Sequence, residues 1–154
     1  SILMVIYIGA DHRGFKLKES ILDFLKNKGY EIVDMGNTRY DESDDYVDFA
    51  KEVAKKVGLN PDDSRGILVC GSGVGMDVAA NKFRAVRSVL AISPDHVYEA
   101  RHDDNVNVLS IAANFTNESD AQKIVGTFLE TPFEKEERYQ RRLNKIEQIE
   151  NEQL

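Results

Sequence analysis

The stretch Gly66-Ile67-Leu68-Val69-Cys70-Gly71-Ser72-Gly73-Val74-Gly75 decides the fold. Residues 66–69 are a short, uninterrupted apolar run, which is typical of a strand buried on both faces. Glycine then recurs at alternate positions, and residues suited to a helix continue from about Val74 to Phe83. We therefore expect a strand, a tight glycine-rich turn and a helix in direct succession.

The same alternation of strands and helices runs along the rest of the chain. Apolar runs predict five strands, at residues 3–8, 31–35, 66–69, 89–92 and 108–112. Apolar residues at helical spacing predict helices after Gly14, at 46–57, at 74–83, from Pro94, at 118–129 and from Glu134 onward. This order predicts one α/β domain over residues 1–154, a doubly wound (flavodoxin-like or Rossmann-like) parallel sheet with helices on both faces. The last helix has a thin apolar stripe, so we expect it to contact a partner subunit.

Composition limits the classes of partner. The 154 residues are 42% hydrophobic and 31% charged, with a net charge of −7, which argues against a nucleic-acid or anionic membrane surface. No apolar run approaches the roughly 18 residues of a membrane span, and the first residues do not read as a secretory signal. A single cysteine cannot form an internal disulfide or supply a zinc cluster. We expect a cytoplasmic protein without nucleic-acid or membrane partners.

Two loops should meet at one end of this sheet. Ligands of doubly wound sheets bind beyond the carboxyl ends of the strands, where the winding direction reverses, which brings residues 9–14 and 70–75 together. Gly71, Gly73 and Gly75 allow successive backbone N–H groups to point into one concavity that favours anions and oxyanions. The alternative is a glycine turn before a packed helix. The sequence lacks the Lys-Ser/Thr of a P-loop and a full Gly-x-Gly-x-x-Gly, which argues against nucleotide binding.

Four side chains on these loops are candidates for chemistry. Cys70 ends a strand close to a helix N-terminus, a position expected to lower the pKa of a thiol, although it could equally be a small buried core residue. Ser72 either hydrogen-bonds the sulfur or a sugar oxygen, or caps the following helix. Asp11 and His12 offer an acceptor for sugar hydroxyls and a donor for phosphate; alternatively, Asp11 caps a helix and His12 is a surface or structural residue.

Two arginines in the last predicted helix form a further candidate. Arg138 and Arg142 are spaced i, i+4 and share a helix face, as two guanidinium groups must to clamp one phosphate. Glu134, Glu136 and Glu137 lie close by in the sequence, so a solvated charged face is the alternative.

Several segments together resemble the ribose-5-phosphate isomerase B family, which includes the galactose-6-phosphate isomerase subunits. They are residues 9–14 (GADHRG), 70–75 (CGSGVG), 79–82 (AANK) and 131–133 (TPF) through Arg138 and Arg142. The resemblance implies an aldose-ketose isomerase, an intramolecular oxidoreductase of carbohydrate metabolism in the pentose phosphate pathway. It also implies a homodimer or homotetramer without metal or organic cofactor, which interconverts ribose 5-phosphate and ribulose 5-phosphate through a cis-enediolate.

The resemblance also assigns roles to residues. Cys70 would be the base that moves a proton between C1 and C2, supported by Ser72, and the amides of residues 71–75 would hold the enediolate oxygen. The substrate contacts that it implies come from Asp11, His12, Tyr46, Gly71, Gly73, Val74, Gly75, Asn81, Arg138 and Arg142.

The chain departs from the family pattern where the sugar ring should open. The usual Arg-x-His-Asn reads Arg-His-Asp-Asp at residues 101–104, so Asp103 falls on the acid histidine and Asp104 on the asparagine. Asn114 falls on a phosphate-binding arginine. Either Asp103 is the ring-opening acid, with a raised pKa, or a shift of the loop brings in His102. An isomerase for a different sugar, or a non-catalytic sugar-phosphate-binding protein, are the remaining alternatives.

Overall fold

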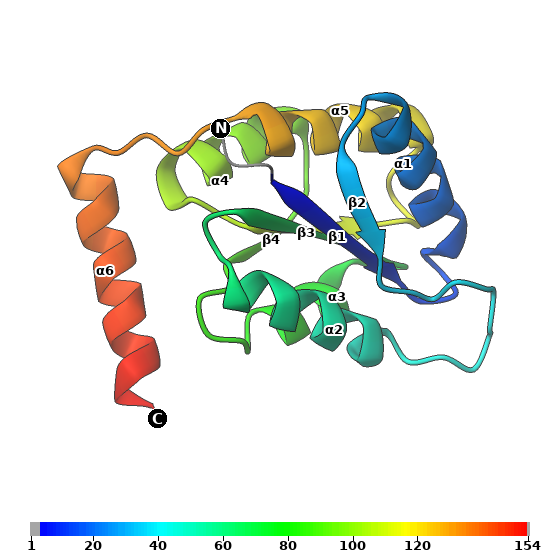
Figure 1. Ribbon diagram of the computed structural model, residues 1–154, viewed down its shortest axis with the longest axis horizontal. Coiled ribbons are helices and arrows are strands. Elements are labelled where there is room, and N and C mark those ends of the chain that lie inside the picture. The colour runs from blue at the N-terminus through cyan, green and yellow to red at the C-terminus, as the bar shows by residue number, and fades with distance from the viewer. Residues whose placement is uncertain (1–3, 154) are drawn as a thin grey trace.

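The computed structural model describes residues 4–153, so the first residue of the predicted strand 3–8 lies outside the described residues. The strands are β1 (Val5–Ala10), β2 (Glu31–Asp34), β3 (Ser64–Cys70), β4 (Ser88–Leu90) and β5 (Val108–Ala112). They form one parallel sheet in the order β2-β1-β3-β5-β4 (Figure 1). The doubly wound class is confirmed, and the last two strands are exchanged relative to the flavodoxin-like order 2-1-3-4-5.

The exchange of β4 and β5 follows from their lengths and burial. All five residues of β5 are buried, whereas β4 has three residues, all of them half-buried. A strand that is buried on both faces is best placed between two hydrogen-bonded neighbours, and a short strand makes a safe sheet edge. The reversal of winding direction between β1 and β3 is unaffected, so the crevice expected there is retained.

Residues 4–153 also form six helices: α1 (Phe15–Asn27), α2 (Tyr46–Leu59), α3 (Val74–Ala80), α4 (Pro94–Asp104), α5 (Glu118–Glu130) and α6 (Glu137–Glu152). Helices α1, α4 and α5 cover one face, and α2 and α3 cover the other (Figure 1). Local signals set their limits. Gly29 follows α1 in the left-handed region at φ +83°, and the Asn117 side chain accepts a hydrogen bond from Asp120 N at 2.8 Å at the start of α5.

Each face of the sheet carries its own apolar core. Ile8, Ile67 and Ile111 pack with α1, α4 and α5, while Leu68 and Val108 pack with α2 and α3. Burying one such side chain stabilises the fold by about 1.5–3 kcal/mol. Because the strands are fixed from both sides, the loops at their carboxyl ends start from rigid positions.

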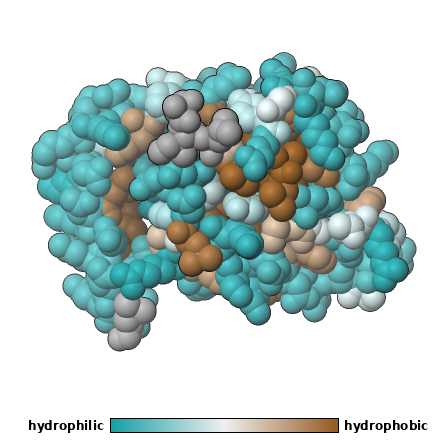
Figure 2. Space-filling model, viewed as in Figure 1, coloured by the Kyte–Doolittle hydropathy of each residue, from teal (hydrophilic) through white to brown (hydrophobic). Residues whose placement is uncertain are grey.

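Helix α6 reaches away from this body (Figure 1). Only Tyr139 and Leu143 of α6 are buried, and near its end Glu150 accepts a hydrogen bond from the backbone N–H of Ala85 at 2.8 Å. Figure 2 shows apolar side chains along the side of α6 that faces the body, on a surface that is otherwise largely hydrophilic. Ile146 and Ile149 remain 44% and 55% exposed. No helix within residues 4–153 combines the length and the apolar character that a membrane span requires.

Candidate active site

A cavity of about 570 Å³ opens at the carboxyl ends of β1 and β3. Its lining brings together nine residues expected from the sequence: Asp11, His12, Tyr46, Cys70, Gly71, Ser72, Val74, Gly75 and Asn114. Arg13, from the expected loop 9–14, also lines it, and two further lining residues, Asp44 and Val78, were not expected. The meeting of the two loops predicted from the order of strands and helices is thus confirmed.

Two glycines shape the loop between β3 and α3. Gly73 has φ +75°, and a Cβ atom there would lie 2.6 Å from Leu90 Cδ1. This residue therefore sets the backbone path and does not line the cavity, whereas we expected it to contact substrate. At Gly75 a Cβ atom would overlap the ring of Tyr46, so glycine allows this ring to lie against the first turn of α3 and to form one wall.

Cys70 is 4% exposed at the end of β3. Burial raises the pKa of its thiol and is the dominant cause, and the charge of Asp11 acts in the same direction. The backbone N–H groups of Met76, Gly73 and Ser72 favour the thiolate, as the helix N-terminus led us to expect. The expectation of a lowered thiol pKa is nevertheless wrong for the free protein, because the loss of hydration outweighs these amides.

Ser72 and Asp11 both accept hydrogen bonds from the backbone near the start of a helix, although the N-cap residues are Gly73 and Gly14. The Ser72 hydroxyl accepts a hydrogen bond from Val74 N, the first residue of α3, at 3.2 Å. Asp11 is buried, and its Oδ1 accepts hydrogen bonds from the backbone N–H groups of Arg13 and Gly14 at 3.0 and 3.1 Å. Both of these hydrogen bonds use one carboxylate oxygen, which leaves the other for a ligand in the cavity that Asp11 lines.

Asp44 is the polar residue of the site that sequence reasoning missed. Its Oδ1 lies 2.7 Å from His12 Nδ1 and accepts a hydrogen bond from His12 N at 3.0 Å. The pKa of His12 is raised, chiefly by this side-chain hydrogen bond. The only signal in the sequence was the acidic loop at residues 40–45, which lies some 30 residues away.

Asp11, His12 and Asp44 also offer ligand atoms within 4.8 Å of one another, as a metal site would. Their arrangement fits a hydrogen-bonded group better. His12 Nδ1 and Asp44 Oδ1 are 2.7 Å apart and share a proton, and one oxygen of Asp11 is occupied by two backbone amides. These contacts must break before a cation could use the same atoms.

The remaining predicted residues lie at the opposite end of the sheet. His102, Asp103 and Asp104 form the end of α4, just before the amino end of β5, and His102 O accepts a hydrogen bond from Glu134 N. His102 Nδ1 lies 2.7 Å from Asp103 Oδ1, and its ring stacks on Tyr98 at 5.5 Å. Burial and the charge of Asp103 raise the pKa of Asp104. One chain therefore does not bring these groups to Cys70.

Arg138, Arg142 and Asn81 are likewise not at the cavity. Arg138 forms an ion pair with Glu136 at 3.0 Å and donates to the Tyr139 hydroxyl at 2.9 Å. Arg142 is exposed on the same helix, α6. The Asn81 side chain bonds both the N–H and the C=O of Ser88, which ties the end of α3 to β4. The predicted substrate contacts of these three residues do not occur at the Cys70 cavity within a single chain.

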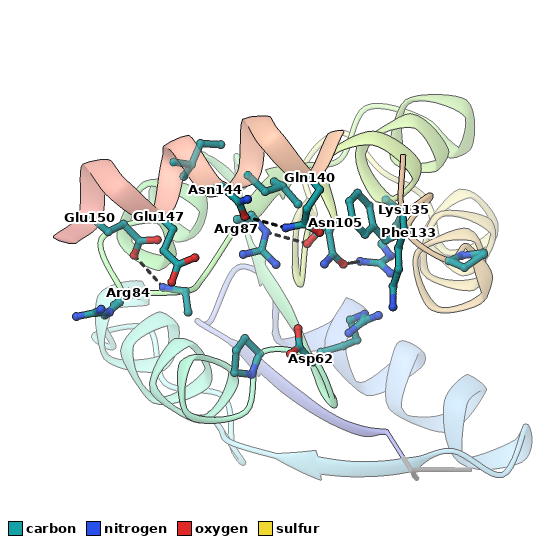
Figure 3. A pocket seen from close by; sticks show the side chains of 17 residues that line it. Asp62, Arg84, Arg87, Asn105, Phe133, Lys135, Gln140, Asn144, Glu147 and Glu150 are labelled. Atoms are coloured by element: carbon teal, nitrogen blue, oxygen red, sulfur yellow. Dashed lines mark hydrogen bonds between the residues drawn. The ribbon is translucent and has the colours of Figure 1, made fainter. Parts of the chain in front are cut away.

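A second cavity, of about 770 Å³, lies between α6 and the body, near the amino ends of β3 and β4 (Figure 3). Arginines 65, 87 and 101 line it, and Arg101 donates to Thr131 O and Val106 O. Burial, with the charges of Arg65 and Arg87, lowers the pKa of Arg101 to about 9. No cysteine or histidine is among its described lining residues, so the smaller cavity is better equipped for proton transfer.

Comparison with known proteins agrees with this geometry. The sequence model of the family described as Ribose/Galactose Isomerase matches residues 6–146, which include both loops of the cavity. The chain belongs to this family.

Two curated members of the ribose/galactose isomerase family show how close the relationship is. A probable ribose-5-phosphate isomerase B of Mycoplasma genitalium is 45% identical over 147 residues, 96% of each chain. The ribose-5-phosphate isomerase B of Mycobacterium tuberculosis (strain CDC 1551 / Oshkosh) is 38% identical over 147 residues, 96% of this chain and 90% of the relative.

A solved structure of the same family matches the fold. The crystal structure of ribose-5-phosphate isomerase B from Mycoplasma genitalium with bound ribulose-5-phosphate superposes with a TM-score of 0.94 at 43% identity. The match covers 99% of both chains. The fold of this ribose/galactose isomerase is thus shared with a relative that holds a pentose phosphate.

Proposed function

We propose that the chain is an aldose-ketose isomerase that interconverts ribose 5-phosphate and ribulose 5-phosphate, with Cys70 as the base. The observation that carries the proposal is the cavity in which Cys70, Asp11 and the glycine loop meet. Family membership and the relative with bound ribulose-5-phosphate support the choice of a pentose phosphate.

The proposed chemistry moves two protons within the sugar, one from C2 to C1 and the other from the O2 hydroxyl to O1. The Cys70 thiolate removes the C2 proton of the open-chain aldose, and the electron pair forms the C1–C2 double bond of a cis-enediolate. Backbone N–H groups of the loop stabilise the negative oxygen, a contribution of about 3 kcal/mol for one such donor. The thiol then returns the proton to C1 while the O2 hydroxyl proton passes to O1, which turns C2 into the carbonyl of the ketose. The reaction requires no metal or organic cofactor, so we expect dialysis against EDTA to leave turnover unchanged.

Burial of the Cys70 thiol makes its thiolate a stronger base but also makes the thiolate harder to form. A thiolate that is poorly hydrated is a stronger base, yet the raised pKa of Cys70 keeps it protonated in the free protein. The amides of Gly73 and Met76 are in place to stabilise the charge when the thiol ionises. Binding of a cationic or hydrogen-bonding partner group at the cavity would raise the thiolate fraction further.

We infer that a second copy of the chain completes the site, in a homodimer or a homotetramer. Of the described residues that line the cavity, only His12 and Arg13 can carry a positive charge, whereas Arg138 and Arg142 lie on α6. Three exposed apolar side chains lie on α3 and just after β4 and β5: Val78 at 53%, Ile92 at 73% and Phe115 at 83%. Exposed apolar side chains at this end of the sheet favour an interface between subunits. The partner's Arg138 and Arg142 could then reach the phosphate.

We assign ring opening to the pair formed by His102 and Asp103, acting on the sugar in the neighbouring subunit. Asp103 accepts from Nδ1 at 2.7 Å, which leaves Nε2 of His102 to exchange the ring-opening proton with the sugar. The sequence left open whether Asp103 or His102 opens the ring. In this assignment both take part, because Asp103, at the family's histidine position, orients the neighbouring His102. Asp104 and Asn114 then remain as substrate-contact residues, the latter at the rim of the Cys70 cavity.

The test is isomerisation of ribose 5-phosphate by the wild-type chain and by Cys70→Ala. Removing a general base typically costs about 10²–10⁴-fold in kcat. The small change at position 70 should leave the circular dichroism spectrum and the substrate KM close to those of the wild type. Unchanged isomerisation by the variant would rule out Cys70 as the base.

A non-catalytic sugar-phosphate-binding protein is the second candidate, because Asp103, Asp104 and Asn114 depart from the family pattern. Exchange of solvent deuterium into C1 or C2 of the sugar discriminates between the two, since a protein that only binds would catalyse none. A panel of phosphorylated and unphosphorylated pentoses and hexoses decides which sugar is preferred.

A further inference from the structure

His12 and Asp44 are held together by two hydrogen bonds to one oxygen atom. Asp44 Oδ1 lies 2.7 Å from His12 Nδ1 and 3.0 Å from His12 N. The Asp44 side chain is 6% exposed and that of His12 is 24% exposed. The carboxylate thus grips both the backbone and the ring of His12, and the ring has little freedom to rotate.

Asp44 is itself held in place by a hydrogen bond on the side away from His12. Its second oxygen accepts a hydrogen bond from Asn37 Nδ2 at 3.2 Å. The backbone oxygen of Asn37 in turn accepts from Nζ of Lys18 at 2.6 Å, and Lys18 is fully buried and bonded to Asp34. This chain of contacts ties the loop before α2 to the core of the molecule, so Asp44 is a rigid support for His12.

This contact determines what His12 can present to a ligand. With Nδ1 engaged by the carboxylate, Nε2 is the nitrogen left for the cavity that His12 lines. Asp44 raises the pKa of His12, with Asp11 acting in the same direction and burial and Arg13 opposing. Asp41 and the edge of the Tyr40 ring also face His12, and Cys70 shares the cavity.

We propose that Asp44 is a positioning residue that holds His12 as a cationic donor, with Nε2 directed at the phosphate group of the sugar phosphate. The inference rests on the proposed function of the same cavity. It matters because, within residues 4–153, His12 and Arg13 are the only residues lining this cavity that can be cationic. A neutral His12 would leave Arg13 as the single positive charge from this chain for a dianionic group.

The test compares Asp44→Asn with the wild type at two pH values. Asparagine can still accept from His12 N but carries no charge, so His12 should be protonated in the variant at pH 5.5 and largely neutral at pH 7.5. Loss of a charge-assisted hydrogen bond is worth about tenfold in affinity. We expect the KM for ribose 5-phosphate to rise about tenfold at pH 7.5 and to stay within about twofold at pH 5.5, with kcat little changed. Titration of the phosphate itself affects both proteins equally and cancels in the ratio.

Glu42→Gln is the matched control, since it removes one exposed negative charge from the same loop without touching the His12 contacts. It should leave the KM unchanged at both pH values. A KM ratio between Asp44→Asn and the wild type that is the same at both pH values would overturn the proposal, because a purely structural defect has no such pH dependence.

A second measurement tests the role of Asp44 in positioning His12 without relying on isomerase activity. The NMR titration of the His12 ring, with and without inorganic phosphate, should show a lower pKa and weaker phosphate binding at pH 7.5 in Asp44→Asn. An unchanged His12 titration would refute the role of Asp44 while leaving the proposed isomerase activity open. Asn37→Ala keeps the carboxylate and removes the amide behind it, so it should show a smaller shift in the same direction. If Asp44→Asn does not fold, the His12 titration in Asn37→Ala tests the role of Asp44 instead.

Discussion

At the scale of single residues, the environment of Cys70 has two opposing effects on the pKa of its thiol. The sulfur is nearly buried, yet three backbone N–H groups favour its ionised form. The sequence allowed the location of Cys70 to be predicted, because it depends on the end of one strand and the start of one helix. The net direction of the pKa shift could not be predicted, since it depends on how much of the sulfur the surrounding residues cover.

This balance predicts the pH dependence of the thiol. The folded pKa of Cys70 is raised, so the thiolate fraction at neutral pH should be small and should grow about tenfold per pH unit up to the pKa, above the ordinary value of about 8.5. Cys70 is the only cysteine, so the rate of alkylation by iodoacetamide reports this site alone. Asp11→Asn removes a charge that raises the thiol pKa and should move the profile to lower pH. A profile centred below that of a free thiol in the wild type would contradict the account.

Asp44 illustrates a limit of sequence reasoning at the same scale. It lies 32 positions from His12, in an acidic loop without helical or strand periodicity. The contact exists because the loop between β2 and α2 folds back over the cavity, which no local pattern encodes. Asp11 and His12, by contrast, follow a strand directly, and the order of strands placed them correctly.

The proposed division of work between His102 and Asp103 gives a second residue-scale prediction. His102→Asn should lower kcat on ribose 5-phosphate by about 10²-fold, and Asp103→Asn by a smaller factor, because the aspartate acts through the histidine. Both losses should be small on an aldotetrose 4-phosphate, whose phosphorylated O4 cannot close a ring. A larger loss for Asp103→Asn than for His102→Asn would instead make the aspartate the acid.

At the scale of elements, most of the fold follows from the sequence. The β5 range was predicted without error, and the alternation of strands and helices fixed the winding and the crevice. The order of β4 and β5 was not expected, because it depends on which strand is buried on both faces. Helix α6 begins at Glu137, later than the expected Glu134, since residues 131–136 are not helical and Glu134 N bonds to His102 O.

The loop between β3 and α3 gives the element-scale prediction. Gly73→Ala places a side chain at φ +75° and within 2.6 Å of Leu90 Cδ1, so it should destabilise the fold by about 1–3 kcal/mol. It should also move the loop amides and lower kcat. Gly126→Ala is the control, because a Cβ atom there meets nothing within 4 Å. Urea unfolding of both variants measures the difference, and equal midpoints would contradict the strain assigned to Gly73.

At the scale of the whole molecule, the candidate groups of one chain fall into two sets at opposite ends of the sheet. Cys70, Asp11 and His12 lie at the carboxyl ends of the strands, and His102, Asp103 and Arg138 lie on α4 and α6. The sequence indicated both sets but not their separation, because one-dimensional motifs do not say which end of a helix faces which end of the sheet. A neighbouring subunit is the arrangement that reunites them.

Subunit mixing tests this arrangement. Cys70→Ala and the double variant His102→Asn/Asp103→Asn should each be nearly inactive alone. When the two chains are co-expressed in equal amounts, random pairing gives one intact site in about four, so about a quarter of wild-type activity should return. The control is a mixture of Cys70→Ala with Cys70→Ser, which offers no intact base and should recover nothing. If verified mixed oligomers of the first pair stay inactive, His102 and Asp103 do not act on the sugar held at the Cys70 loop of a neighbouring chain.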